Sequence, residues 1–265
     1  MNKLYNFIFI HNDDIDVMRT IGDKINSSQN DSDLIIRFVD DYYDFSKYGL
    51  QSVSIFVNTN ISLIGNENGT VFDFNYDKQI GITFQFDTKE KTKTLKIENI
   101  KFEKFYPKNS GGIGRTQVLL YFNFYLNKSD NFYIIFNNCN FQNNNHELIK
   151  VDIYLDVATY DDYRIQFNNC KFLNNTERLI QLYHKFDEYH MEIYDSIKVL
   201  MNNCTFINNR GYFSEIQSDE NEVTRGAFIT TLYGNEYVII ENSQFENINI
   251  QSNVPLIYGN LLFMK

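Results

Sequence analysis

Short runs in which apolar and polar residues alternate recur along this chain, and each is followed by a fixed polar motif. From Tyr163 to Phe167 every second residue is apolar, as in a β-strand that buries one face. Two asparagines follow, and then Cys170 and Phe172 lie two residues apart. One strand cannot keep both apolar sets on a single face, so we expect the chain to turn a corner at 168–169. Asparagine suits such a corner because it tolerates the left-handed backbone conformation.

The motif after each run is an asparagine, a small residue, any residue and a phenylalanine; it occurs four times, with a looser copy before them. Its members are Asn99, Asn138, Asn169, Asn203 and Asn242, with Phe102, Phe141, Phe172, Phe206 and Phe245. Successive phenylalanines lie 39, 31, 34 and 39 residues apart, so segments of fixed length alternate with loops of variable length. Self-similarity of this kind predicts a solenoid, in which each repeat stacks on its neighbours.

A second apolar strand is predicted before each alternating run, so each repeat contains three strands. These second strands are expected at 118–126, 148–157, 179–186 and 227–232. Three strands in a repeat of this length predict an all-β parallel β-helix of three sheets. Neither a leucine template nor a 3.6-residue period is present, which argues against leucine-rich repeats and helical arrays.

Stacked coils would place equivalent residues in columns about 4.8 Å apart. We expect the motif asparagines to form an inward or corner ladder, in which each amide bonds to the coils above and below. The motif phenylalanines should form an aromatic column in the core, since such columns hold parallel strands in register. On this interpretation Asn203 is a buried ladder residue.

The first third of the chain is less regular. Residues 1–10 form an apolar run that Asn6 interrupts, with no small-residue cleavage site after it, so a first strand is favoured over a signal peptide. A short amphipathic helix is predicted at 14–26, with Asp13 or Asp14 as its N-cap. Its apolar stripe consists of Ile15, Met18, Ile21 and Ile25. Such a helix would cover the exposed end of the first coil.

One domain is expected over 1–265, with the strand and capping helix in 1–33 and coils in 34–265. Early strands are predicted at 34–38, 53–57, 61–65 and 70–74. The apolar segments 255–258 and 261–263 look like the opening strands of a further, incomplete coil. Two interpretations stay open: the chain is a fragment of a longer protein, or this apolar edge associates with a partner.

The repeat motifs, together with segments 61–66 and 71–74, resemble the pectin-lyase-like superfamily of right-handed parallel β-helices. The resemblance covers nearly the whole chain and implies a right-handed helix with an N-terminal capping helix. It does not imply an activity, because one fold hosts many functions. Of four polygalacturonase-like segments, only the Asp-Asp pair is matched, at 40–41 and 161–162, and the pectate-lyase-like Arg-x-Pro-x-x-Arg segment is absent. No catalytic residue is therefore assigned.

Composition and charge limit the classes of partner that the protein is expected to bind. The net charge is −10, which argues against nucleic acid or an anionic membrane as the main partner. No apolar stretch approaches the roughly 20 residues of a membrane-spanning helix. The chain has 36 asparagines, and several lie in glycosylation sequons that would suit a secreted protein, although some arise by chance.

Other candidate sites have both a functional and a structural interpretation. Cys139, Cys170 and Cys204 occupy one slot of successive repeats, and without CxxC or histidine spacing they are expected to be free thiols rather than metal ligands. His184 and His190 flank an acidic pair and could assist a cation or a proton transfer, or lie in a plain loop. The acidic segment 208–225 could bind calcium or a partner, or simply be solvated. No cofactor or metal is assigned.

The leading hypothesis is a non-enzymatic β-helix module, a rigid structural, adhesion or binding surface for carbohydrate or protein, within a longer extracellular protein. The alternative is a carbohydrate-active enzyme, a polysaccharide lyase or glycoside hydrolase, that uses acidic residues beside 151–156 and 183–188.

Overall fold

A computed structural model describes most of the chain. The described residues are 5–12, 17–30, 32–45, 53–76, 81–86, 91–106, 118–124, 131–153, 162–176, 178–184, 198–211, 229–232, 237–250, 257–258 and 261–264. Apart from the helix α1 (Val17–Ser28), the regular elements among these residues are β-strands.

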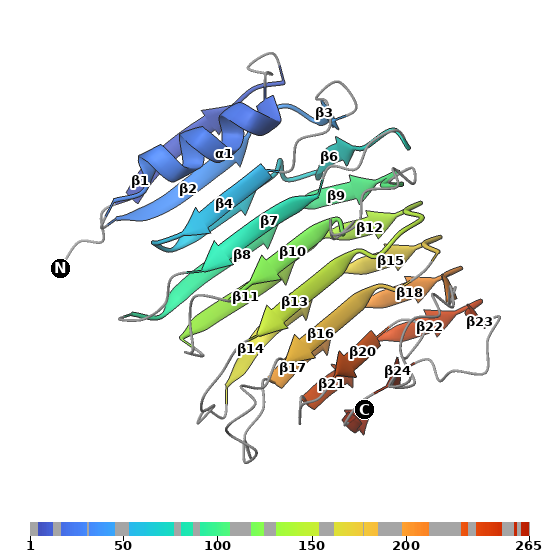
Figure 1. The fold of residues 1–265 in the computed structure, drawn as a ribbon. Helices are drawn as coiled ribbons and strands as arrows, with labels where there is room; N and C mark the ends of the chain where they lie inside the picture. The colour runs from blue at the N-terminus through green and yellow to red at the C-terminus, as the bar shows by residue number, and fades with distance from the viewer. Residues whose placement is uncertain are drawn as a thin grey trace, which may run out of the picture.

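The strands form three large parallel sheets and one small one (Figure 1). Sheet A has nine strands: β1 (Tyr5–Ile10), β2 (Asp33–Phe38), β5 (Ile61–Ile64), β8 (Lys93–Glu98), β11 (Phe132–Asn137), β14 (Tyr163–Asn168), β17 (Lys198–Asn202), β21 (Tyr237–Glu241) and β25 (Leu261–Met264). Sheet B has seven: β3 (Tyr42–Asp44), β6 (Thr70–Asp73), β9 (Ile100–Glu103), β12 (Asn140–Gln142), β15 (Lys171–Leu173), β18 (Thr205–Ile207) and β22 (Gln244–Glu246). Sheet C also has seven: β4 (Val53–Val57), β7 (Ile82–Phe86), β10 (Leu120–Asn123), β13 (Ile149–Ile153), β16 (Ile180–His184), β20 (Ile229–Leu232) and β24 (Ile257–Tyr258). The small pair is β19 (Arg210–Gly211) with β23 (Asn249–Ile250).

From β2 onward, and apart from the small pair β19 and β23, successive strands belong to sheets A, B and C in turn, and each strand pairs in parallel with its equivalent one coil away. The predicted right-handed parallel β-helix of three sheets, with a short helix near its N-terminus, is confirmed. Equivalent positions pair directly: Phe141 lies opposite Phe102 on one side and Phe172 on the other. The alternation of apolar and polar residues therefore becomes an inside and an outside for every coil.

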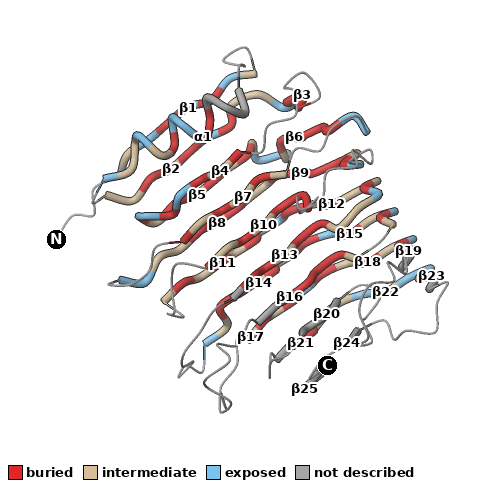
Figure 2. Tube along the Cα trace, in the orientation of Figure 1, coloured by how far each residue is buried: buried red, intermediate tan, exposed pale blue. Residues whose placement is uncertain are grey.

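The core is a set of aromatic and aliphatic columns along the helix axis. Ring centroids of Phe102 and Phe141 lie 5.1 Å apart, those of Phe141 and Phe172 5.0 Å, and those of Phe172 and Phe206 4.9 Å. Phe245 stacks on Phe206 at 4.4 Å but is only partly buried. Figure 2 shows the buried residues within the strands and exposed ones mainly at the strand ends. Each stacked pair contributes about 0.5–1.5 kcal/mol beyond the apolar area that it buries.

The helix α1 covers the free edge of β4, the first strand of sheet C. Ile21 and Ile25 are buried, as predicted. The Asn26 amide donates to Ser54 O at 3.0 Å and accepts from the Phe56 N–H at 2.8 Å. It therefore bonds to backbone groups of the edge strand β4 as a neighbouring strand would. The described helix spans 17–28 rather than the predicted 14–26. The proposed N-cap residues 13 and 14 and the stripe residue Ile15 lie outside the described residues, as does the side chain of Met18.

Several strands were not predicted from the sequence, among them β3, β7 and the short pair β19 and β23. β3 is only three residues long, and it forms the first strand of sheet B. β7 alternates clearly, with Ile82, Phe84 and Phe86 buried, but no Asn-x-x-Phe motif lies next to it. The strands predicted within 118–126, 148–157, 179–186 and 227–232 correspond to β10, β13, β16 and β20, each shorter than expected within the described residues.

Candidate functional site

The motif asparagines lie at the corner between sheets A and B. Asn99, Asn138, Asn169, Asn203 and Asn242 all have positive φ, between 52° and 57°. This is the left-handed region that asparagine tolerates better than other residues with a Cβ.

Their side chains also bond from coil to coil, so the predicted asparagine hydrogen bonding between coils is present. The amide of Asn138 donates to Asn99 Oδ1 at 3.2 Å, Asn169 to Asn138 Oδ1 at 3.3 Å, and Asn203 to Asn169 Oδ1 at 2.7 Å. Asn242 departs from the series and donates to Asn202 Oδ1 at 3.1 Å. The expectation that Asn203 is buried is wrong, because its side chain is exposed at the corner.

A second exposed asparagine column follows sheet B. Asn143, Asn174, Asn208 and Asn247 have φ between 51° and 55°, so each coil turns here through the left-handed region again. The Asn174 amide donates to Asn143 Oδ1 at 3.3 Å, and the Asn208 amide donates to Asn174 Oδ1 at 3.2 Å. We call this the outer column of the second corner.

Immediately after the outer column lies a buried one, formed by Asn144, Asn175 and Asn209, each at most 1% exposed. Asn175 shows its bonding: Nδ2 donates to Phe141 O at 2.9 Å and to Asn209 Oδ1 at 3.1 Å. Its Oδ1 accepts from the backbone N–H of Asn144 at 3.1 Å. The column thus satisfies buried backbone groups that the bend removes from the sheets.

This inner column was not predicted from the sequence. The signal was present: an asparagine stands three residues after Phe141, Phe172 and Phe206. Apolar residues replace it at both ends, Phe105 in the preceding coil and Ile248 in the following one. The Phe105 N–H still donates to Asn144 Oδ1 at 2.9 Å.

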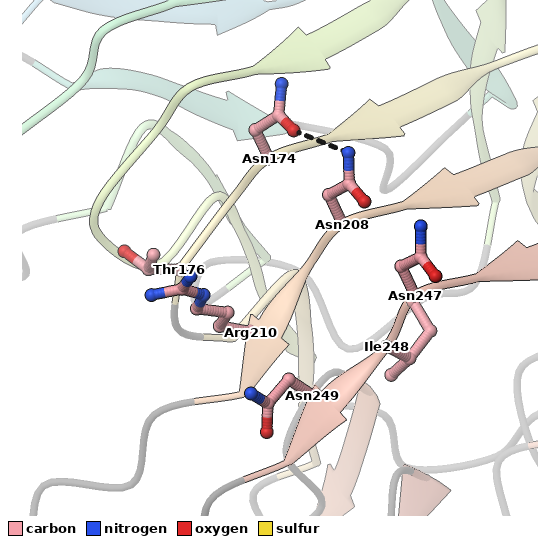
Figure 3. A pocket seen from close by; sticks show the side chains of 7 residues that line it. All are labelled: Asn174, Thr176, Asn208, Arg210, Asn247, Ile248 and Asn249. Atoms are coloured by element: carbon pink, nitrogen blue, oxygen red, sulfur yellow. Dashed lines mark hydrogen bonds between the residues drawn. The ribbon is translucent and has the colours of Figure 1, made fainter.

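A polar cleft of about 660 Å³ lies where the inner column ends. Its lining residues form two rows on either side of Ile248 (Figure 3): Asn174, Asn208 and Asn247 in the first, and Thr176, Arg210 and Asn249 in the second. Thr176 forms a parallel bridge with Arg210, which pairs with Asn249, so the second row is held by strand pairing. The cleft thus has a rigid backbone and a polar wall on each side.

Three side chains of the cleft lack the bonding of their neighbours. Among the residues that the structure describes, Arg210 makes no ion pair, and the side-chain amides of Asn247 and Asn249 make no hydrogen bond. All three are exposed. The cleft therefore offers uncommitted donors and acceptors to a ligand.

An ionic cluster on the outer side of sheet C is a second candidate. The Tyr121 hydroxyl donates to Asp152 Oδ2 at 2.6 Å, and Lys150 Nζ lies 3.4 Å from Asp152 Oδ1. Nearby, Arg178 Nη1 donates to Glu147 Oε1 at 3.2 Å. Burial raises the pKa of Glu147, although Arg178 and Lys150 act in the opposite direction. A carboxyl of raised pKa beside charged groups suits general acid catalysis as well as a structural ion pair.

A network on the outer side of sheet B has a structural explanation. Asp73 Oδ2 accepts from Tyr42 Oη at 2.8 Å and from Lys104 Nζ at 2.6 Å. Burial would raise the pKa of Asp73, but bonds from Lys104, the Asn75 amide and Tyr42 outweigh it and hold that pKa below its usual value. Burial and the bond to Asp73 raise the pKa of Tyr42 to about 12. Each member bonds to a residue of a neighbouring coil, so the network holds these coils together.

The cysteine column is buried rather than reactive. Cys139, Cys170 and Cys204 are free and at most 1% exposed, and each thiol donates to a backbone carbonyl of the preceding coil at 3.4–3.7 Å. Burial raises the pKa of the Cys170 thiol well above its ordinary value, which suppresses the nucleophilic thiolate. Among the described residues, no group of three or more His, Cys, Asp or Glu side chains is placed to hold a metal ion.

Two described residues among the remaining sequence candidates, Asp40 and Asp162, make hydrogen bonds of their own. Asp40 accepts the Asn12 N–H at 2.5 Å, and Asp162 accepts the Tyr133 hydroxyl at 3.0 Å. Asp161, His190, the acidic pair 187–188 and residues 212–225 of the acidic segment lie outside the described residues. Within the described part of the chain, no helix has the length and hydropathy to span a membrane.

Comparison of the chain with protein-family models and with curated proteins finds no match.

Proposed function

We propose that the protein is a non-enzymatic β-helix module that presents a rigid binding surface for carbohydrate, within a longer extracellular protein of the pectin-lyase-like superfamily. The observation that carries this proposal is the cleft at the second corner. Its walls are amides, a hydroxyl and a guanidinium on paired backbone, and its floor contains Ile248. Planar amides and Arg present directional donors and acceptors to ring hydroxyls, while an apolar floor suits a ring face.

Rigidity supports a binding role. The first row is fixed by the Asn208 to Asn174 bond, and the backbone N–H of Arg210 donates to Asn175 O at 2.8 Å. A preorganised surface loses little conformational entropy when it binds a ligand.

An oligosaccharide array, read for binding and for cleavage, tests this proposal. The expected result is retention of a subset of oligosaccharides with no change in their chain length. Asn247→Ala combined with Asn249→Ala should abolish retention, whereas Asn66→Ala, at the opposite end of the helix, should leave it unchanged. Cleavage of the retained oligosaccharides would contradict the proposal, and so would retention that survives the double substitution.

The ionic cluster on sheet C supports a second candidate, a carbohydrate-active enzyme. The supporting observation is Glu147, whose side chain is 16% exposed and whose pKa burial raises. A protonated Glu147 would be the general acid, and Asp152, beside Lys150, would be the second carboxyl group. Any turnover on the array should then disappear in Glu147→Gln while binding persists. Turnover that Glu147→Gln leaves unchanged would eliminate this assignment.

A further inference from the structure

Regular amide bonding stops at the coil that contains β22 and β23. In the outer column the Asn208 amide bonds to Asn174, but no hydrogen bond joins Asn247 to Asn208 among the described residues. In the inner column Ile248 occupies the next position after Asn209. The side-chain amides that bond from coil to coil earlier in the helix are therefore available to a ligand here, and this is where the cleft lies (Figure 3).

Arg210 gives this cleft a positive charge in an acidic protein. The chain has a net charge of −10, and several cations elsewhere are held in ion pairs, such as Lys104 with Asp73 and Arg178 with Glu147. Arg210 is exposed and makes no ion pair with any residue in the described part of the chain. A guanidinium presents a planar fork of N–H donors that matches a carboxylate or a sulfate with two parallel hydrogen bonds.

We infer that the cleft binds a sugar that carries an oxyanion, with Arg210 as the anchor of that group. This inference rests on the proposed carbohydrate-binding function. The amides of Asn247 and Asn249 stand on the two polar walls, where they can bond to ring hydroxyls next to the anionic substituent. Ile248 lies between the walls and contacts the apolar face of the ring. The oxyanion is a carboxylate or an ester sulfate, since both fit the guanidinium fork.

Isothermal titration of the full chain with three matched oligosaccharides tests the inference: a neutral one, its uronate counterpart and its sulfated counterpart. We expect at least one charged form to bind ten-fold or more tightly than the neutral form, and the preferred form identifies the oxyanion. Arg210→Gln keeps a polar side chain but removes the charge, so it should equalise the charged and neutral ligands. Arg37→Gln is the matched control, because Arg37 is exposed on the outer side of β2, at the other end of the helix.

The outcomes separate the inference from the function beneath it. Equal affinity for neutral and charged forms in the native chain would overturn the inference and leave carbohydrate binding intact. A preference for charged ligands that survives Arg210→Gln would also overturn it. Binding of none of the three would reject both. Inorganic sulfate should compete with the sulfated oligosaccharide for the native chain. Titrated alone, it should bind to the native chain and not to Arg210→Gln. The thermal unfolding midpoint of each variant shows whether it remains folded.

Discussion

Of the asparagine columns along the β-helix, the exposed one at the first corner and the buried one at the second corner make the sharpest comparison, because the same side chain has a different role in each. In the exposed column at the first corner, Asn138, Asn169 and Asn203 are required mainly by the backbone, because each has φ near 55°. In the buried column, Asn144, Asn175 and Asn209 are required by hydrogen bonding, because their amides bond backbone groups that have no access to water.

The difference shows that a repeated asparagine need not have one physical cause. An exposed left-handed residue can exchange its side-chain bonds for bonds to water, so its identity matters mainly through conformational energy, about 1–2 kcal/mol for most residues. A buried amide cannot make this exchange. Each backbone group that it leaves unpaired costs about 1–3 kcal/mol.

The largest effect is expected in the buried column. Asn175→Leu would remove the donor to Phe141 O and the acceptor of the Asn144 N–H. We expect the free energy of unfolding to fall by about 3 kcal/mol or more, measured by urea denaturation with circular dichroism. A loss as small as that of an exposed ladder substitution would contradict the proposed role of the buried column.

The Asp73 network provides a contrast with the amide columns, because only the network titrates. The pKa of Asp73 is lowered in the folded state, so its contribution is fully present above the unfolded pKa of about 4 and is lost as the pH falls through the folded pKa. Asp73→Asn should therefore cost about 2 kcal/mol at pH 7 and progressively less toward pH 2. The exposed ladder variants should show the same loss at both pH values. A pH-independent effect of Asp73→Asn, measured in urea at each pH, would disprove this assignment.

The two asparagines of one corner separate conformation from bonding. Asn168 and Asn169 each donate to an asparagine of the preceding coil, at 3.0 and 3.3 Å, but only Asn169 has positive φ. Asn169→Leu should therefore lower the free energy of unfolding more than Asn168→Leu, by an excess of about 1–2 kcal/mol. Asn169→Gly should recover most of that excess. Equal effects of the two leucine variants would show that the backbone conformation is not limiting.

The smallest effect is expected in the cysteine column. Ser243 stands in the equivalent slot of the next coil, where its hydroxyl donates to Glu241 O at 2.8 Å and accepts from the Cys204 N–H at 3.0 Å. Because a hydroxyl is accommodated in that slot, Cys170→Ser should cost less than about 1 kcal/mol. In the native protein the thiols should not react with iodoacetamide until urea unfolds the chain. Rapid labelling of the folded protein, followed by mass spectrometry, would contradict their burial.

Much of the fold is readable from the sequence because two signals coincide in each repeat. Alternation identifies β14, and Asn169 marks the corner that separates it from β15. β7 was missed; it alternates but has no motif beside it.

The candidate site was harder to predict. Asn144 stands within Asn143–Asn144–Asn145, which reads as a polar loop, and polarity gives no sign that the central amide is buried. The cleft is even harder to predict from the sequence. Thr176, Arg210 and Asn249 meet only because the turns of three coils place them in register, and the intervening loops differ in length.

Disulfide trapping between coils tests the register most directly. With the native cysteines replaced by serine, Lys171→Cys and Thr205→Cys would place thiols at directly paired positions of β15 and β18. Parallel neighbours lie about 4.8 Å apart, within the range of a disulfide, so oxidation should link them efficiently. The control pair Lys171→Cys and Ile207→Cys is displaced by two residues along the strand and should stay reduced. Efficient linkage of the control pair, with none for the direct pair, would contradict the stacked columns on which this account depends.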